Sequence, residues 1–429
     1  MKWSLKALMW AVVCCLGTAQ ASAETPAYTT AFNSAAAENT SYTLTSSGAC
    51  CQDDCCNSGL FGFGLIQPRP LGEPWKVKDL CGFDYGGWIQ MGYQDRNDGA
   101  FTGNGFFQNQ NEAGNLNLNQ LYTYVAKVAD GSCGLDWGFR FDSMYGVDGN
   151  EAQSFGNVNA GRWDFANGFG GPAPDPVDHG PYEIALPQAY LEVAAGDLST
   201  KIGHFYTPIG YEVVTSPNNF FLSRQLTFYN SEPFTHTGFL STYKISDNLS
   251  VIGGWTAGWD TGFYRYNDGS NAVYGFTATL TDNITLAWAG ALGNFGWRGD
   301  GNISSGILTV KLTDKWTVIG QMDMLNTNAG TPGGPPPTGG TFQTTGITNN
   351  SVGAIGYSFY QLTDRLAIGA RNEWYKADGI SYYTYTSGLN YKLTPNLIIR
   401  PEIRRNDSNG DPNGLFNRTI VGCDAILTF

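Results

Sequence analysis

The segment Ile245-Ser246-Asp247-Asn248-Leu249 places the turn-forming pair Asp247-Asn248 between apolar residues that favour strands. Four further versions of it follow: Leu280-Thr281-Asp282-Asn283-Ile284, Leu312-Thr313-Asp314-Lys315-Trp316, Leu362-Thr363-Asp364-Arg365-Leu366 and Leu393-Thr394-Pro395-Asn396-Leu397. Asp, Asn and Pro favour tight turns, so each version predicts a hairpin. The spacings of 35, 32, 50 and 31 residues leave room for two strands of about 10 to 12 residues plus one longer loop.

Two more short turns lie upstream, at Asp130-Gly131-Ser132 and Gly196-Asp197. Seven short turns have fourteen flanking strands, and an opening strand near residues 83–94 and a closing strand near residues 414–429 bring the total to sixteen. An even number with both ends on the short-turn side is typical of bacterial outer-membrane barrels. A further hairpin inside residues 146–183 or 207–236 would raise the count.

A soluble solenoid can also repeat with a period of about 33 residues. The extra length between these turns varies, however, and it lies in stretches rich in Gly, Asn and Pro. Variable loops on one side of a barrel account for this pattern better than a repeat of fixed length does.

The expected strands alternate with a period of two. In the first, Phe83, Tyr85, Ile89, Met91 and Tyr93 share one face, while the other face holds Asp84, Gly86, Gln90 and Gln94. The segment from Leu135 to Asp142 repeats the pattern, with Leu135, Trp137, Phe139 and Phe141 opposite Asp136, Gly138, Arg140 and Asp142. Such strands favour lipid on one face and water on the other. The chain ends on an aromatic residue, Phe429, as many outer-membrane barrels do.

The first 23 residues have the features of a secretory signal. Lys2 and Lys6 precede an apolar run from Leu8 to Leu16, and Ala21-Ser22-Ala23 forms a small-residue cleavage site. Residues 24–80 show no sustained periodicity and are expected to form a flexible periplasmic leader. We expect residues 81–429 to form one transmembrane barrel.

The composition agrees with a barrel in the outer membrane. The chain holds 56 Gly, 48 Tyr plus Phe and 12 Trp, with 14% charged residues. Large barrels use glycine in turns and aromatic residues in two interfacial girdles. Without Lys2 and Lys6, 22 basic residues oppose 37 acidic residues, a formal net charge of −15. This balance argues against nucleic acid as a partner.

Seven cysteines follow the expected signal, and four of them form the group Cys50, Cys51, Cys55 and Cys56. The group is read as a disulfide-linked loop or as a metal site, although the His or Cys residues that usually complete a zinc site are missing. Cys81 precedes the first strand and Cys133 lies in the first short turn, so a disulfide between them would fix the leader to the barrel. Cys423 and the leader cysteines are competing partners.

Five segments carry a resemblance to a known family: Gly87-Trp88-Ile89-Gln90-Met91-Gly92-Tyr93, Lys201-Ile202-Gly203-His204-Phe205-Tyr206, Gly210-Tyr211-Glu212-Val213-Val214, Tyr229-Asn230-Ser231-Glu232-Pro233-Phe234-Thr235-His236-Thr237-Gly238, and Gly253-Gly254-Trp255-Thr256-Ala257-Gly258-Trp259-Asp260-Thr261-Gly262-Phe263. They resemble the OmpL-like β-barrel porins that are numerous in planctomycete bacteria. The resemblance runs from about residue 81 to the end, and it implies an outer-membrane barrel with a porin role. It transfers no catalytic or ligand-binding residue to this chain.

Strand alternation predicts which charged side chains face inward and would line a pore. In a pore, walls of low dielectric constant focus the electric field of such charges on passing solutes. Near residues 366–375 and 397–405, Leu366, Ile368, Trp374, Leu397, Ile399 and Ile403 are expected to face lipid. The pore-lining candidates are Arg140, Asp142, Lys201, Arg371, Glu373, Arg400, Glu402 and Arg404. The alternative is that these charges neutralise one another in a solvated wall.

The third long loop, about residues 207–236, is the candidate constriction, because general porins fold their third loop inward. It contains the candidates Glu212, Arg224, Glu232 and His236. The alternatives are a plain surface loop or an oligomer contact.

We therefore expect a passive diffusion channel in the bacterial outer membrane, with lipid and small hydrophilic solutes as partners. No cofactor is implied, and a homo-oligomer, a trimer by analogy, is the expected state. The three histidines, His179, His204 and His236, do not lie at metal-ligand spacing. Two carboxylates such as Asp142 and Glu402 suffice for glycoside hydrolysis, but no acidic pair stands out, so an enzyme on a barrel is a weaker reading. A structural or adhesive barrel that does not conduct is the other alternative.

Overall fold

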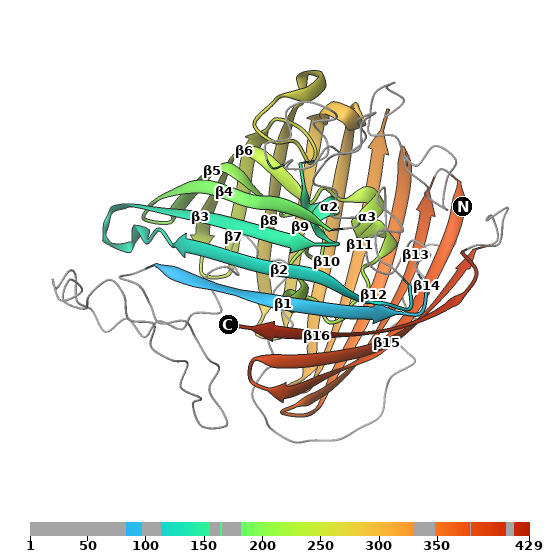
Figure 1. Cartoon of the computed structure of the whole chain (residues 1–429). Helices are drawn as coiled ribbons and strands as arrows, with labels where there is room; N and C mark the ends of the chain where they lie inside the picture. Colours follow the sequence, from blue (N-terminus) through green and yellow to red (C-terminus); the bar gives the residue numbers. More distant parts are fainter. Residues whose placement is uncertain are drawn as a thin grey trace, which may run out of the picture.

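The computed structural model describes residues 83–96, 113–154, 164, 182–328, 348–377, 379–408 and 416–429. Within them, sixteen strands form one closed sheet (Figure 1). The first eight are β1 (Asp84–Gln94), β2 (Leu116–Lys127), β3 (Leu135–Gly146), β4 (Glu183–Ala195), β5 (Leu198–Tyr206), β6 (Thr235–Ser246), β7 (Leu249–Thr256) and β8 (Ser270–Thr281). The others are β9 (Ile284–Asn294), β10 (Asp300–Thr313), β11 (Trp316–Thr327), β12 (Asn350–Thr363), β13 (Leu366–Ala377), β14 (Ile380–Thr394), β15 (Leu397–Ser408) and β16 (Thr419–Thr428).

The sheet closes because β1 pairs with β16, with Trp88 opposite Thr428 and Met91 opposite Ala425. Every neighbouring pair is antiparallel. A closed ring leaves no strand edge with unpaired backbone groups, which is the condition for strands to cross lipid. The expected sixteen-stranded antiparallel barrel is confirmed.

The repeated turns have one geometry. In each of the five versions, the Ser or Thr before the turn accepts a backbone N–H from two residues ahead, as Thr313 Oγ1 does from Lys315 at 3.2 Å. The strand register also shifts just before each of these turns, which marks a β-bulge. The hydroxyl satisfies an N–H that the tight turn leaves unpaired. This explains why Ser or Thr always precedes the Asp or Pro.

The two faces of the wall differ as the alternation predicts. Leu135 is 81% exposed and Ile202 is 54% exposed on the outer side, whereas Gln90 and Asp142 are closed off on the inner side. Among the described residues, no helix is long and apolar enough to cross a bilayer.

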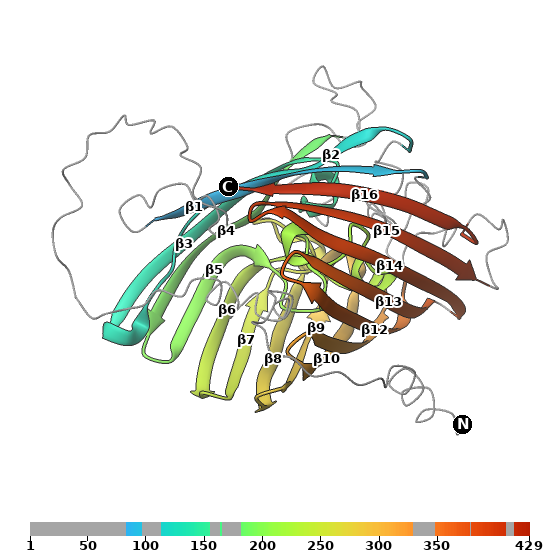
Figure 2. The same ribbon diagram turned by 90° about the horizontal axis from the view of Figure 1, so that it is seen from below.

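The segment between β5 and β6, residues 207–234, is here called the inward loop. It contains a short 3-10 helix, η6 (Ser216–Asn218), and the α-helix α3 (Leu226–Ser231), and it holds no strand. Figures 1 and 2 show it inside the ring of strands. The shorter helix α2 (Gly149–Ala152) follows β3, and the 3-10 helices η4 (Gly131–Cys133), η7 (Tyr266–Asp268) and η8 (Gly296–Arg298) lie in other connections.

Candidate functional site

The inward loop begins and ends at neighbouring strands, but its middle reaches the inner face of distant ones. Its base closes where the Thr207 amide donates to the Phe234 carbonyl at 3.0 Å. Between these points it contacts β1, β2, β11, β13 and β15 through polar side chains. The loop therefore crosses the barrel from one wall to the other.

Arg400 on β15 anchors the first part of the loop. Its Nη1 donates to the carbonyls of Ser216 at 3.0 Å and Asn219 at 2.6 Å. Its Nε donates to Asp424 of β16 at 2.9 Å, and Gln90 of β1 donates to the same carboxylate at 2.6 Å. The seam between β1 and β16 thus lies beside this anchor.

Two carboxylates of the wall accept loop amides. Glu402 Oε2 accepts N–H groups from Leu222 at 2.7 Å and Ser223 at 3.2 Å. Glu373 accepts the N–H groups of Leu226 at 2.9 Å and Thr227 at 2.8 Å, the first two of α3. The first N–H groups of a helix have no partner within it, and a carboxylate also favours the positive end of the helix. The wall therefore caps the loop helix.

Arg371 and Arg404 hold the centre of the loop. Arg371 pairs with Glu212 at 2.5 Å and donates to the Ser223 carbonyl at 2.8 Å. Arg404 donates to the Arg224 carbonyl at 2.7 Å. Arg371 and Arg404 are both fully buried, and buried charges are retained only when paired and hydrogen-bonded.

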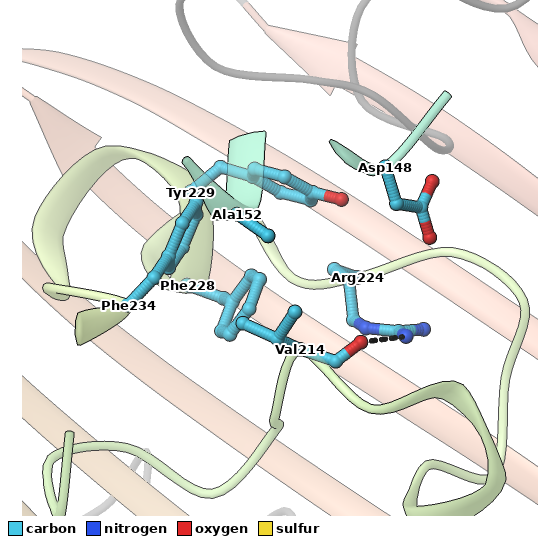
Figure 3. A pocket seen from close by; sticks show the side chains of 7 residues that line it. All are labelled: Asp148, Ala152, Val214, Arg224, Phe228, Tyr229 and Phe234. Atoms are coloured by element: carbon cyan, nitrogen blue, oxygen red, sulfur yellow. Dashed lines mark hydrogen bonds between the residues drawn. The ribbon is translucent and has the colours of Figure 1, made fainter. Parts of the chain in front are cut away.

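Arg224 belongs to the loop and shapes it from within. It donates to the carbonyls of Val213, Phe221 and Leu222 at 2.9 to 3.1 Å. It also lines a cavity of about 10 Å³ with Asp148, Ala152, Val214, Phe228, Tyr229 and Phe234 (Figure 3). A cavity of this size is at the lower limit of what can hold one water molecule. Burial raises the pKa of Asp148 to about 6, and the Arg224 guanidinium opposes that rise.

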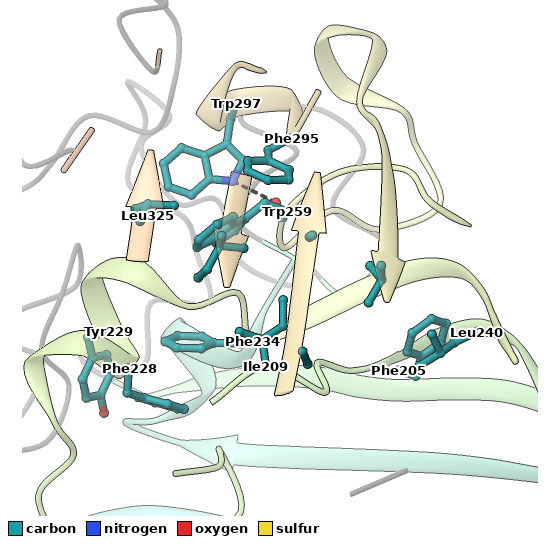
Figure 4. Packing of buried hydrophobic residues seen from close by; sticks show 14 of the residues in the cluster. Phe205, Ile209, Phe228, Tyr229, Phe234, Leu240, Trp259, Phe295, Trp297 and Leu325 are labelled. Carbon is teal, nitrogen blue, oxygen red and sulfur yellow. Dashed lines mark hydrogen bonds between the residues drawn. The ribbon is translucent and has the colours of Figure 1, made fainter. Parts of the chain in front are cut away.

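Aromatic packing completes the contact with the wall. Phe220 stacks on Phe359 of β12 at 4.6 Å between ring centroids, and Tyr211 lies 4.8 Å from Tyr357. At the other end of the loop, Phe228 and Phe234 stack at 4.6 Å within a cluster that includes Trp259 and Trp297 (Figure 4). The loop is thus fixed by a packed core as well as by charges.

Glu232 lies near the end of the loop, at the wall formed by β11. Gln321 donates to Glu232 Oε1 at 2.7 Å and to Asp323 Oδ1 at 2.9 Å. A Cβ atom on Gly210 would lie 1.9 Å from Glu232 Oε2. Gly210, at φ +97°, therefore leaves the space that the Glu232 carboxyl group fills.

His236 is buried at the start of β6, with Thr207 Oγ1 3.0 Å from its Nε2. The structure thus places all four constriction candidates inside the barrel wall or in the loop that fills it. No group of three potential metal-ligating side chains occurs among the described residues. The cysteine group at residues 50–56 and Cys81 lie outside them, so the Cys81–Cys133 disulfide stays a prediction.

The pore-lining candidates divide into two groups. Arg371, Glu373, Arg400, Glu402 and Arg404 face inward but lie under the inward loop. Arg140, Asp142 and Lys201 lie on β3 and β5 and make other contacts: Arg140 Nε donates to Asp142 Oδ1 at 2.8 Å, and Lys201 Nζ lies 4.7 Å from the centre of the Tyr190 ring.

Three lysines face inward at the short-turn end of the wall. The backbone amides of Lys244, Lys311 and Lys392 donate to carbonyls of the preceding short turns at 2.8 to 2.9 Å, so the three occupy one position of the repeated turn. They lie on β6, β10 and β14, four strands apart. Lys244 pairs with Asp247 at 2.7 Å, while Lys311 and Lys392 are partly exposed.

The sequence reading missed several residues of the site, including Gly210, Ser216, Gln321, Asp323 and Asp424. Alternation along β11 and β16 places Gln321, Asp323 and Asp424 on the inner face and would have found them. No pattern in the sequence indicates that Ser216 meets Gln90, or that Gly210 meets Glu232, because these contacts depend on how the loop crosses the barrel.

The family model described as "Putative beta-barrel porin-2, OmpL-like" matches residues 82–429. No curated protein matches the chain. Among solved structures, the outer membrane channel DcaP of Acinetobacter baumannii is similar with a TM-score of 0.51 and 10% identity, over 82% of this chain and 99% of that one. This likeness agrees with the closed barrel.

Two further solved structures are similar at lower scores. A mutant of the Rhodopseudomonas blastica porin has a TM-score of 0.49 and 13% identity, over 81% of this chain and 100% of that one. A loop-deletion mutant of OmpT, an outer membrane protein of Vibrio cholerae, has a TM-score of 0.48 and 10% identity, over 81% of this chain and 99% of that one.

Proposed function

This chain belongs to the OmpL-like β-barrel porin family, and on that premise we propose that it forms a passive pore for small hydrophilic solutes and ions in the bacterial outer membrane. The driving force is the concentration gradient of the solute. The observation that carries the proposal is the inward loop, which crosses the lumen and is fixed to the far wall by Arg371, Arg400 and Arg404. A fixed segment across a closed barrel sets the width of the remaining path.

The inward-facing charges then have two tasks. Arg371, Glu373, Arg400, Glu402 and Arg404 hold the constriction in place. Arg140 lies on a part of the wall away from these anchors and is partly exposed, so it is the candidate that lines the path itself. Asp142 and Lys201 are buried beside it, against Gln188 and Tyr190. The field along such a path acts on passing ions because the surrounding wall has a low dielectric constant.

The remaining features of the proposal follow from the sequence. Residues 1–23 serve as the export signal and residues 24–80 as a periplasmic leader, with Cys81 and Cys133 as its disulfide attachment. The mature protein works without a cofactor and without catalysis, and a homo-oligomer, by analogy a trimer, is its functional state.

The test is single-channel conductance of residues 24–429 in a planar bilayer, compared with a variant that lacks residues 216–228. That deletion removes thirteen residues of the loop and should raise the conductance of each channel. A control variant lacks the thirteen residues 332–344, from the connection between β11 and β12. If the two deletions change conductance equally, the inward loop is not the constriction.

A second candidate function is a barrel that does not conduct and serves a structural or adhesive role. The complete burial of Arg371 and Arg404 under the loop favours it, because that part of the lumen holds protein rather than water. A folded protein that shows no conductance steps, and gains them only after deletion of residues 216–228, would establish this candidate instead.

A further inference from the structure

Two carboxyl groups meet where the inward loop returns to the barrel wall. Glu232 lies near the end of the loop and Asp323 on β11. The two carboxyl groups lie side by side, because Gln321 Nε2 donates to one oxygen of each, at 2.7 Å and 2.9 Å. Glu232 is 2% exposed and Asp323 is 1% exposed. The pair joins the loop to a strand 91 positions away in the sequence.

The donors around this pair satisfy only one oxygen of each group. Gln321 Nε2 donates to Glu232 Oε1 and to Asp323 Oδ1, and Ser305 donates to Asp323 Oδ1 at 2.6 Å. Glu232 Oε2 and Asp323 Oδ2 are buried and accept no hydrogen bond. Ionised carboxylates only accept, so two of them in contact need a proton between them.

The surrounding charges do not relieve this repulsion. The nearest further charges are also negative. The Glu212 carboxylate of the loop repels a charged Glu232, and the Glu373 carboxylate of β13 repels a charged Asp323. Arg371 pairs with Glu212, and Gln321 and Ser305 are neutral. Burial and the neighbouring carboxyl group raise the pKa of Glu232 well above its usual range.

The backbone around Glu232 is arranged for this carboxyl group. A Cβ atom on Gly210 would lie 1.9 Å from Oε2 and 2.8 Å from Oε1, so the glycine backbone closes one side of the group. A bound calcium or magnesium ion needs six or more oxygen ligands around it, and this close contact leaves little room for them. A single proton needs no such space.

We propose that Glu232 and Asp323 share one proton, and that this proton fastens the end of the inward loop to β11 and releases it when pH rises. The effect on the channel rests on the proposed pore function: the channel is narrow in acid and wider in base. Above the titration of the pair, both groups are charged and repel. The loop end then loses a bond to the wall and gains a repulsion.

The test follows single-channel conductance from about pH 5 to about pH 10, a range that begins above the ordinary carboxyl pKa of about 4 and covers an upward shift. Wild-type conductance is expected to rise with pH, and the rise should disappear in Glu232→Gln. The glutamine amide can donate permanently to Asp323, so this variant keeps the closed arrangement. Glu192→Gln, on β4 beside Ser199, is the matched control and should retain the rise. A conducting channel with no pH response, or a response that survives in Glu232→Gln, overturns the proposal.

A second measurement tests for the shared proton independently of whether the protein conducts. A protonated carboxyl group has its own infrared C=O band. The spectrum of the wild-type barrel in detergent at neutral pH should show one such band in its difference from Glu232→Gln, and again in its difference from Asp323→Asn. The band of Asp260, which also holds a proton near neutral pH, cancels in both differences. The band with no conductance would refute the pore while retaining the proton pair. Its absence, or a divalent ion found bound in its place, refutes the pair.

Discussion

Arg371 on β13 and Glu212 in the inward loop form a salt bridge with 2.5 Å between Nη1 and Oε1, and neither side chain is exposed to solvent. The same guanidinium donates to the Ser223 carbonyl and to Ser223 Oγ, while Gln225 N and Tyr357 OH donate to Glu212. The pair thus joins the loop to β12 and β13.

Replacing one member of this pair should release the loop. Glu212→Gln leaves Arg371 buried without its counter-charge, and breaking a buried pair in this way costs about 3 to 5 kcal/mol. We expect faster proteolysis within residues 216–228 and higher single-channel conductance. Adding Arg371→Met should recover part of the loss, because the buried guanidinium that lacks its counter-charge is then gone. Asp136→Asn, which breaks a partly exposed pair with Lys127 far from the loop, is the control and should change neither. Equal proteolysis rates for Glu212→Gln and wild type would contradict this.

Gly210→Ala should displace the end of the loop. The residue has φ +97°, which costs an alanine about 1 to 2 kcal/mol, and the new Cβ would also lie 1.9 Å from Glu232 Oε2. Gly379→Ala isolates the second effect, because Gly379 has φ +96° and nothing within 4 Å of an added Cβ. Urea unfolding and conductance should show a larger change for Gly210→Ala than for Gly379→Ala. Matching changes would mean that only backbone strain matters at both sites.

The lysines at the short-turn mouth should bias ion selectivity. Lys311 and Lys392 face inward and are partly exposed, so replacing both with Glu reverses the local potential. The anion to cation permeability ratio should fall by roughly twofold or more, measured as the reversal potential in a salt gradient. Lys376→Glu, on the exposed outer face of β13, is the control. A shift of the same size in the control would place the effect outside the pore.

Asp260 should make stability depend on pH. It follows β7, accepts the amides of Phe234 and Thr235 at 2.7 and 2.8 Å, and burial raises its pKa from 3.8 to about 7. The folded protein thus holds this proton more tightly than the unfolded chain does. Its contribution to stability is full below pH 3.8 and is lost as pH rises to about 7.

The comparison is urea unfolding of wild type and Asp260→Asn across that range. Asparagine keeps the accepting oxygen but does not titrate, so wild type should lose stability relative to the variant by at most about 1.4 kcal/mol per pH unit. Asp247→Asn is the control, since the Lys244 ammonium lowers the pKa of Asp247 and confines its effect to lower pH. A constant difference between wild type and Asp260→Asn would show that the proton is not held.

The barrel could be predicted because its rules are local. A turn such as Leu312-Thr313-Asp314-Lys315-Trp316 fixes a hairpin by its own chemistry, and alternation then assigns Arg371 and Ile403 to opposite faces. The strand number followed from the same turns, because seven short turns have fourteen flanking strands and the two ends of the barrel add one strand each.

The use of the inward charges could not be predicted in the same way. Alternation places Arg400 and Glu402 inside but does not say whether they meet water or protein there. Both in fact hold backbone groups of residues 216–223. That outcome depends on the path of one long loop, which has no periodicity and is fixed by contacts with residues almost 200 positions away.

The position of the loop anchors also determines the order in which the protein can assemble. The loop leaves the chain after β5, whereas Glu373 and Arg400 lie 147 and 184 positions beyond the loop residues that they bind. Contacts so distant in sequence form slowly, because the chain between them must first be ordered. Strands β13 and β15 must therefore be in place before the loop can dock. A chain that stops before β13 would lack Glu373 and Arg400, so its loop could not be held across the interior of the barrel.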